Sequence, residues 1–238
     1  MLKHAIEWMQ MVVTVAEALL LVRVLSLRLH RVYAYITLYC TVNILFDAVS
    51  WYLGWETRES VRISTYSLFL FALLYPLVVW DVFEESKAQI AKLRRLQTIR
   101  LVSGLTITGV FAILLGLTIE ATDANGNSSM APFLGVFLLT GSASACAAFL
   151  WVIQRFVRAQ KVMMAHNTAV WSLFFLIALS LEIVGCIAEI IRPFVPATAA
   201  DMLAVILLSV EFALIGWCMF RLKAIPSDVP SARENASP

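Results

Sequence analysis

The chain has 238 residues, of which 61% are hydrophobic and only 14% are charged. A soluble domain carries about 25% charged residues, so the composition excludes an ordinary soluble protein. The formal net charge of +2 is too small, and the charges are too scattered, to indicate a nucleic-acid partner. We therefore predict a polytopic membrane protein whose surroundings are the lipid bilayer.

Long apolar stretches separated by short polar segments run along the chain. Stretches of about 20 residues match the hydrocarbon core of a bilayer, and a segment in lipid must satisfy its own backbone hydrogen bonds as a helix. The pattern predicts an all-α fold with seven transmembrane helices, which form one domain over residues 1–225. The predicted spans are Ile6–Leu25, Val32–Trp55, Ile63–Phe83, Leu101–Ile119, Pro132–Val152, Ala169–Ile191 and Leu203–Phe220. Residues 226–238 are polar and are predicted to be a disordered cytoplasmic tail.

The Lys and Arg residues are distributed unequally between the two sides of the predicted bundle. Of the 18 in the chain, only Lys3, Arg58, Arg62 and Arg192 lie on the side of the N-terminus. Cytoplasmic loops carry the excess of Lys and Arg. We therefore predict that the N-terminus is outside and the C-terminus is cytoplasmic, in a multi-pass protein of the bacterial inner membrane.

The tryptophans support this topology, because they fall near the ends of the predicted spans, where aromatic belts form. Those at the outer ends are Trp8, Trp51 and Trp55, and those at the inner ends are Trp80, Trp151, Trp171 and Trp217.

Two features of the spans bear on helix packing. Pro76 lies inside the third span, where it frees the carbonyl of Ala72 and is expected to kink the helix. The segment Thr140–Ala148, "TGSASACAA", is small nearly all round, and small residues let helix backbones approach closely. We expect close helix packing at the fifth span.

Four predicted helices carry an acidic residue at depth. These are Glu17, Asp47, Glu182 and Glu211, in the first, second, sixth and seventh spans. A carboxylate at the bilayer centre costs about 3 kcal/mol on insertion scales, so each should face the interior of the bundle. No Lys or Arg lies in the middle of any predicted span to pair with them. Burial then favours carboxyls that stay partly protonated, face water or meet a cation.

The acids are accompanied by other polar residues. Asn43 shares a helix face with Asp47, and Gln10, Thr14 and Glu17 fall on one stripe. We predict a polar cavity between helices one, two, six and seven, with Glu17, Asn43, Asp47, Glu182 and Glu211 as its ligand- or proton-binding residues. Glu182 is expected to point inward, with Asp47 as its favoured companion. The alternative is that each acid is protonated and holds two helices together.

Several known chemistries do not fit the chain. A retinal pigment needs a Schiff-base lysine in the seventh helix, and Leu203–Phe220 contains none. Haem within a bundle needs a histidine at depth, and His4, His30 and His166 all lie near span ends. The sequence has no HExxH, GxSxG or phosphate-binding loop. We expect no enzymatic activity, no cofactor and no metal site.

Two segments carry a resemblance to known proteins. "RLHRVYAYITLYC" (Arg28–Cys40) and "VMMAHNTAVWSLFF" (Val162–Phe175) resemble segments of uncharacterised seven-helix membrane proteins of bacteria. The layout also resembles the seven-helix sensory regions of histidine kinases. A polar interior without a catalytic constellation or a phosphate-binding loop predicts a receptor-like or sensory module that binds a small ligand, cation or proton, and whose output would need a separate cytoplasmic signalling partner. A small-solute or proton-coupled transporter and an accessory subunit of a membrane complex are the alternatives. No oligomeric state is predicted.

Overall fold

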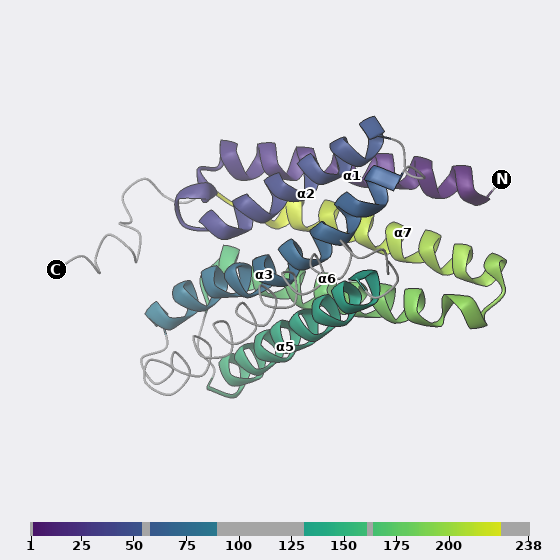
Figure 1. Cartoon of the computed structure of the whole chain (residues 1–238). Coiled ribbons are helices and arrows are strands. Elements are labelled where there is room, and N and C mark those ends of the chain that lie inside the picture. The colour runs from purple at the N-terminus through teal and green to yellow at the C-terminus, as the bar shows by residue number, and fades with distance from the viewer. Residues whose placement is uncertain (1, 54–57, 90–130, 161–163, 225–238) are drawn as a thin grey trace.

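The computed structural model describes residues 2–53, 58–89, 131–160 and 164–224, and every regular element in these ranges is helical (Figure 1). The long helices are α1 (Leu2–Ser26), α2 (Ala34–Leu53), α3 (Arg58–Gln89), α5 (Ala131–Gln160), α6 (His166–Ile191) and α7 (Ala197–Arg221). Two short 3₁₀ helices, η1 (Leu29–Arg31) and η3 (Arg192–Phe194), follow α1 and α6.

All six of these helices are long and apolar enough to cross a membrane. The prediction of a helical, multi-pass membrane protein is therefore confirmed. The predicted fourth span, Leu101–Ile119, and the predicted tail, 226–238, lie outside the described residues. Helices α3 and α5 extend beyond their predicted spans, because hydropathy marks the part of a helix that lies in lipid and not the end of its hydrogen bonding.

The described helices pack in a closed ring. Helix α1 contacts α2 and α7, α3 contacts α2 and α5, and α6 contacts α5 and α7, while α3 also touches α6 across the ring (Figure 1). The largest fully buried side chains include Leu29, Ile36, Phe83, Trp171 and Phe175. These residues belong to the halves of the bundle that were predicted to be cytoplasmic, as do most of the fully buried large side chains, so the core is most deeply buried toward that end.

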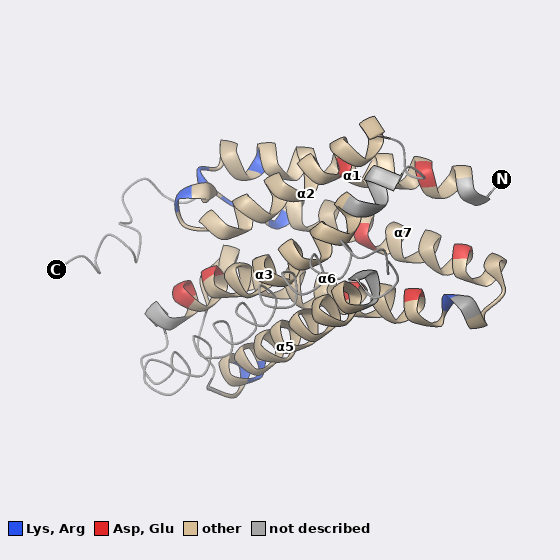
Figure 2. Ribbon diagram, in the orientation of Figure 1, with Lys and Arg blue, Asp and Glu red and all other residues tan. Residues whose placement is uncertain are grey.

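Side-chain hydrogen bonds join the predicted cytoplasmic helix ends to one another. Tyr33, directly before α2, lies with its hydroxyl 2.9 Å from that of Thr168 at the start of α6. Asp81 of α3 is fully buried and accepts the N–H groups of Tyr35 and Ile36 at 2.6 and 3.1 Å, so a carboxylate from another helix caps the start of α2. Figure 2 shows most Lys and Arg of the described residues toward this end of the bundle.

The start of α6 also holds the end of α7. The side chain of Asn167 donates to the carbonyl of Lys223 at 2.8 Å and accepts the N–H of the same residue at 3.0 Å. His166 donates to the carbonyl of Arg221 at 2.8 Å. The backbone that leaves α7 is extended at Leu222, whose side chain is buried, so these bonds fix the direction in which the chain leaves the bundle.

The carbonyl that Pro76 frees is satisfied by a neighbouring helix. Ser142 Oγ of α5 donates to the carbonyl of Ala72 at 2.7 Å, and both residues are buried. Polar side chains of neighbouring helices commonly satisfy backbone groups freed by a proline in a membrane helix. The bond lies where the small residues of α5 meet α3.

The tryptophans differ in exposure, and Trp51, Trp80 and Trp217 are half-buried. Trp8 is 67% exposed, and Trp151 is exposed with the Arg155 guanidinium 5.2 Å from its ring centre, as residues in an interfacial belt would be. Trp171 is fully buried and stacks on Phe175, with their ring centres 5.8 Å apart. The prediction that Trp171 lies in an aromatic belt is therefore wrong, because its position at a helix end coincides with the tightest part of the core.

Candidate functional site

The faces that α1, α2 and α7 turn toward the core carry the predicted acids. On α1, Val13, Glu17 and Leu20 are buried at spacings of three and four residues, so Glu17 continues an apolar face. On α2 and α7, Asp47 and Glu211 extend the faces that carry the buried Cys40 and Cys218 nearer the predicted cytoplasmic end. Helical periodicity therefore directs all three carboxyls inward.

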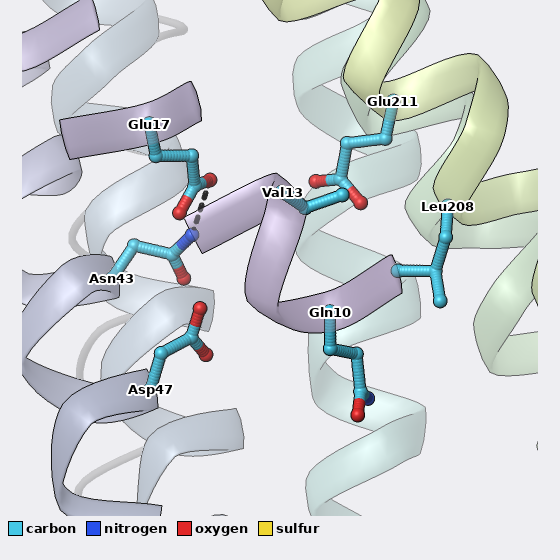
Figure 3. A pocket seen from close by; sticks show the side chains of 7 residues that line it. All are labelled: Gln10, Val13, Glu17, Asn43, Asp47, Leu208 and Glu211. Atoms are coloured by element: carbon cyan, nitrogen blue, oxygen red, sulfur yellow. Dashed lines mark hydrogen bonds between the residues drawn. The ribbon is translucent and has the colours of Figure 1, made fainter. Parts of the chain in front are cut away.

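A half-open pocket of about 180 Å³ lies between these faces. Figure 3 shows its lining, which consists of Gln10, Val13 and Glu17 from α1, Asn43 and Asp47 from α2, and Leu208 and Glu211 from α7. Three carboxyls, two amides and two aliphatic side chains therefore meet in one space, and no Lys or Arg is among its lining residues.

Glu17 is the most buried of the carboxyls, with 7% of its surface exposed. Its Oε1 accepts a hydrogen bond from Asn43 Nδ2 at 2.6 Å. Its Oε2 is also buried, and it has no hydrogen-bond partner among the described residues. Leaving a buried polar atom unsatisfied costs about 1–3 kcal/mol, and more when the group is charged. The pocket thus contains an acceptor with no donor to match it.

Asp47 is held by a hydroxyl of α1. Thr14 Oγ1 lies 2.6 Å from Asp47 Oδ2 and 2.9 Å from the carbonyl of Gln10. A hydroxyl has a single proton and donates only once. Both hydrogen bonds can therefore form together only when the Asp47 carboxyl carries a proton and donates it to Thr14.

Glu211 supplies the carboxyl on the opposite side of the pocket. Figure 3 shows it reaching from α7 toward α1, across from Glu17 and Asp47. The three carboxyls lie close enough to interact electrostatically, Glu17 with both of the others and Glu211 with Asp47. Three acids that share one pocket favour any bound positive charge.

Glu182, the fifth predicted site residue, is placed differently. It is not among the residues that line the pocket, and its Oε1 lies 3.9 Å from Cys186 Sγ, one turn along α6. Its charge interacts with that of Glu211. The expected pairing of Glu182 with Asp47 differs from the structure, in which Asp47 bonds Thr14 and Glu182 lies beside Cys186. The structure thus brings Glu17, Asn43, Asp47 and Glu211 together and sets Glu182 to one side.

Three lining residues and one supporting residue were not among the predicted site residues. Gln10 and Thr14 share the stripe of Glu17, so their spacing was the signal that could have identified them. Val13 and Leu208 have no such signal, because one aliphatic residue in a membrane helix looks like any other.

An aromatic cluster lies next to the pocket on its predicted cytoplasmic side. Tyr39, one turn before Asn43 on α2, has its ring centre 5.6 Å from that of Phe175, 5.8 Å from Phe71 and 6.0 Å from Tyr75. Beyond it lies the core that contains Ile36. The rings therefore lie on the predicted cytoplasmic side of Asn43, although none of them is among the residues that line the pocket.

Comparison with family models, curated proteins and solved structures finds no match to this chain. The chemistry of the site is therefore argued from its geometry. Among the described residues, no group of three or more His, Cys, Asp or Glu side chains is arranged to hold a metal ion. What the pocket offers is three carboxyls, one buried acceptor without a partner among the described residues, and a small apolar wall, within one half-open space.

Proposed function

We propose that the protein is a receptor-like membrane module whose pocket between α1, α2 and α7 binds a small cation or a proton. The observation that carries this proposal is Glu17 Oε2, a buried acceptor without a donor among the described residues, in a pocket with two further carboxyls. A bound cation would supply the missing donor or charge. The proposal includes no chemical step.

The packing below the pocket favours reception over transport. The rings around Tyr39 and the core beyond them lie toward the predicted cytoplasmic end, where they would close the route from the pocket on that side. A ligand would therefore enter and leave on one side, and its binding would alter how α1, α2 and α7 pack. The bonds between Asn167 and the backbone of Lys223 connect α6 to the end of α7 and offer a route to a cytoplasmic signalling partner.

The proposal includes a complete topology of seven spans with the N-terminus outside, in a bacterial inner membrane. It is supported by the concentration of described Lys and Arg at one end of the bundle (Figure 2). A fluorescent protein fused after Lys223 should fold and fluoresce in the cytoplasm. Alkaline phosphatase inserted after Phe194 should be active in the periplasm. The opposite pattern would reverse the topology.

Binding can be tested on the purified protein in lipid nanodiscs. The thermal unfolding midpoint is measured against sodium, ammonium and butylammonium chlorides, with N-methylglucamine chloride keeping the ionic strength constant. At least one cation should raise the midpoint, because a ligand that binds only the folded state stabilises it. A proton as the ligand would instead make the midpoint depend on pH. Either response should be lost in Glu17→Gln.

The matched control is Glu7→Gln, which removes an exposed carboxylate from the same helix that is bonded to His4. This variant should respond as the natural chain does. A midpoint that follows neither pH nor any cation would refute the proposed function. In proteoliposomes, the stabilising cation should not enter down its concentration gradient. Uptake that depends on Glu17 would show that the protein is a transporter and not a receptor.

A further inference from the structure

The pocket is rich in hydrogen-bond acceptors and poor in donors. The carboxyls of Glu17 and Glu211 only accept hydrogen bonds when they are ionised, and Asp47, whose Oδ2 is engaged with Thr14, has its Oδ1 left as a further acceptor. Of the two amides in the lining, that of Asn43 already donates to Glu17. Thr14, beside the pocket, also has its single proton engaged. The remaining donors of the wall are the second N–H of Asn43 and the amide of Gln10, so acceptors outnumber donors and a matching ligand brings donors of its own.

The same wall has an apolar part. Val13 of α1 and Leu208 of α7 line the pocket together with the carboxyls (Figure 3). A bare inorganic cation gains nothing from aliphatic side chains, whereas an alkyl group buried against them gains about 25 cal/mol per Å². The lining is therefore suited to a ligand with a charged end and an apolar end.

The size of the pocket sets the length of that ligand. An apolar protein cavity of about 150 Å³ holds a benzene molecule, with its six carbons. The pocket, at about 180 Å³, is slightly larger. It admits a ligand of roughly five to eight non-hydrogen atoms by this comparison.

From the excess of acceptors, the two aliphatic residues and this volume, we infer that the pocket takes a primary organic ammonium ion with a short alkyl chain. The ammonium group has three N–H donors, and one of them would bond Glu17 Oε2. The others would face the carboxyls of Asp47 and Glu211, and the alkyl chain would lie against Val13 and Leu208. This inference rests on the proposed function, because it names the class of cation that the same pocket binds.

The test uses two isomeric cations. Butylammonium and tetramethylammonium have the same atoms and the same charge, but only butylammonium has N–H donors. Binding of each to the protein in nanodiscs is measured by isothermal titration calorimetry, with empty nanodiscs as background. Sodium ion and uncharged 1-butanol are the further probes. Hydrogen bonds to charged groups contribute about 1.5–3 kcal/mol, so butylammonium should bind roughly 10- to 100-fold more tightly than its isomer.

The variants separate the pocket from the membrane surface. Glu17→Gln should weaken butylammonium binding about tenfold or more by the same reasoning. Glu211→Gln, on a different helix, should weaken it as well and guards against a local folding defect in α1. Glu7→Gln, the exposed carboxylate of α1, should bind butylammonium as the natural chain does.

The possible failures are distinguishable. If tetramethylammonium binds as tightly as butylammonium, the pocket responds to charge alone and the inference is overturned. Equal binding of sodium or of 1-butanol overturns it too, in favour of an inorganic ion or of simple partitioning. When tetramethylammonium or sodium binds as tightly as butylammonium, binding that still depends on Glu17 leaves the proposed function standing. If the natural chain binds no cation and its stability does not follow pH, both the inference and the proposed function fall.

Discussion

Replacing Ser142 with alanine tests the packing of α3 against α5. Ser142 Oγ donates to the carbonyl of Ala72 at 2.7 Å, and Pro76 has no N–H with which to bond that carbonyl itself. Ser142→Ala therefore leaves a buried backbone acceptor without its interhelical donor. We expect the substitution to lower the free energy of unfolding and not to act on the pocket, because Ser142 and Ala72 lie outside the residues that line it.

The magnitude follows from two limits. An orphaned buried acceptor in a soluble protein costs about 1–3 kcal/mol. Interhelical hydrogen bonds measured in a membrane protein average about 0.6 kcal/mol and reach about 1.7, because the unfolded chain in lipid also finds partners. Ser142 is 3% exposed and Ala72 is fully buried, so water cannot easily replace the hydroxyl. We expect a loss of about 1–1.5 kcal/mol in the free energy of unfolding, near the upper membrane value.

The assay is unfolding in bicelles by titration with sodium dodecyl sulfate. The matched control is Ser180→Ala on α6, where an exposed serine donates at the same 2.7 Å distance to the carbonyl of Leu176 within its own helix. That carbonyl keeps its helical N–H partner, so the control should change the free energy of unfolding by less than about 0.5 kcal/mol, as most surface substitutions do.

The same substitution is also made in a chain that carries Pro76→Ala, which tests whether the cost of losing the Ser142 hydroxyl depends on the proline. Pro76→Ala restores an N–H that can bond the carbonyl of Ala72, so Ser142→Ala should cost little when Pro76→Ala is also present. The double-mutant cycle should give a coupling close to the cost of Ser142→Ala alone. An equal cost in both backgrounds, or no cost in either, would refute the reasoning that Ser142 replaces the bond that Pro76 cannot make.

Three further substitutions test other contacts. Asp81→Ala leaves the first N–H groups of α2 without their carboxylate acceptor and should lower the free energy of unfolding in the same titration by about 2 kcal/mol. Asp81→Asn keeps an acceptor oxygen and should lower it less, and equal losses would show that the hydrogen bonds to those N–H groups do not stabilise the fold. Asn167→Ala removes both bonds to the backbone of Lys223, so trypsin should cut after Lys223 faster than in the natural chain, and an unchanged rate would contradict a fixed end of α7. Thr14→Val removes the hydroxyl beside Asp47 and should cost about 1 kcal/mol, whereas Thr14→Ser keeps the hydroxyl and should cost less than half as much.

The sequence by itself determined the spans and the depth of the acids. A run of about 20 apolar residues is a local property, and lipid accepts such a run only as a helix, so six predicted spans reappear as described helices. The cost of a charge in lipid likewise predicts that Glu17, Asp47 and Glu211 face inward. The third span shows the same logic, because the missing N–H of Pro76 predicts a free carbonyl at Ala72.

Only the tertiary structure decided which inward faces meet. Ala72 and Ser142 are 70 residues apart, and the backbone of Tyr35 meets Asp81 from another helix. Glu182 has the same pattern of depth and helix face as the other acids, yet it lies beside Cys186 while the rest line the pocket. The physical reason is that periodicity and hydropathy report the direction of a side chain relative to its own helix. The rotation and neighbours of that helix are set by the packing of all the helices together.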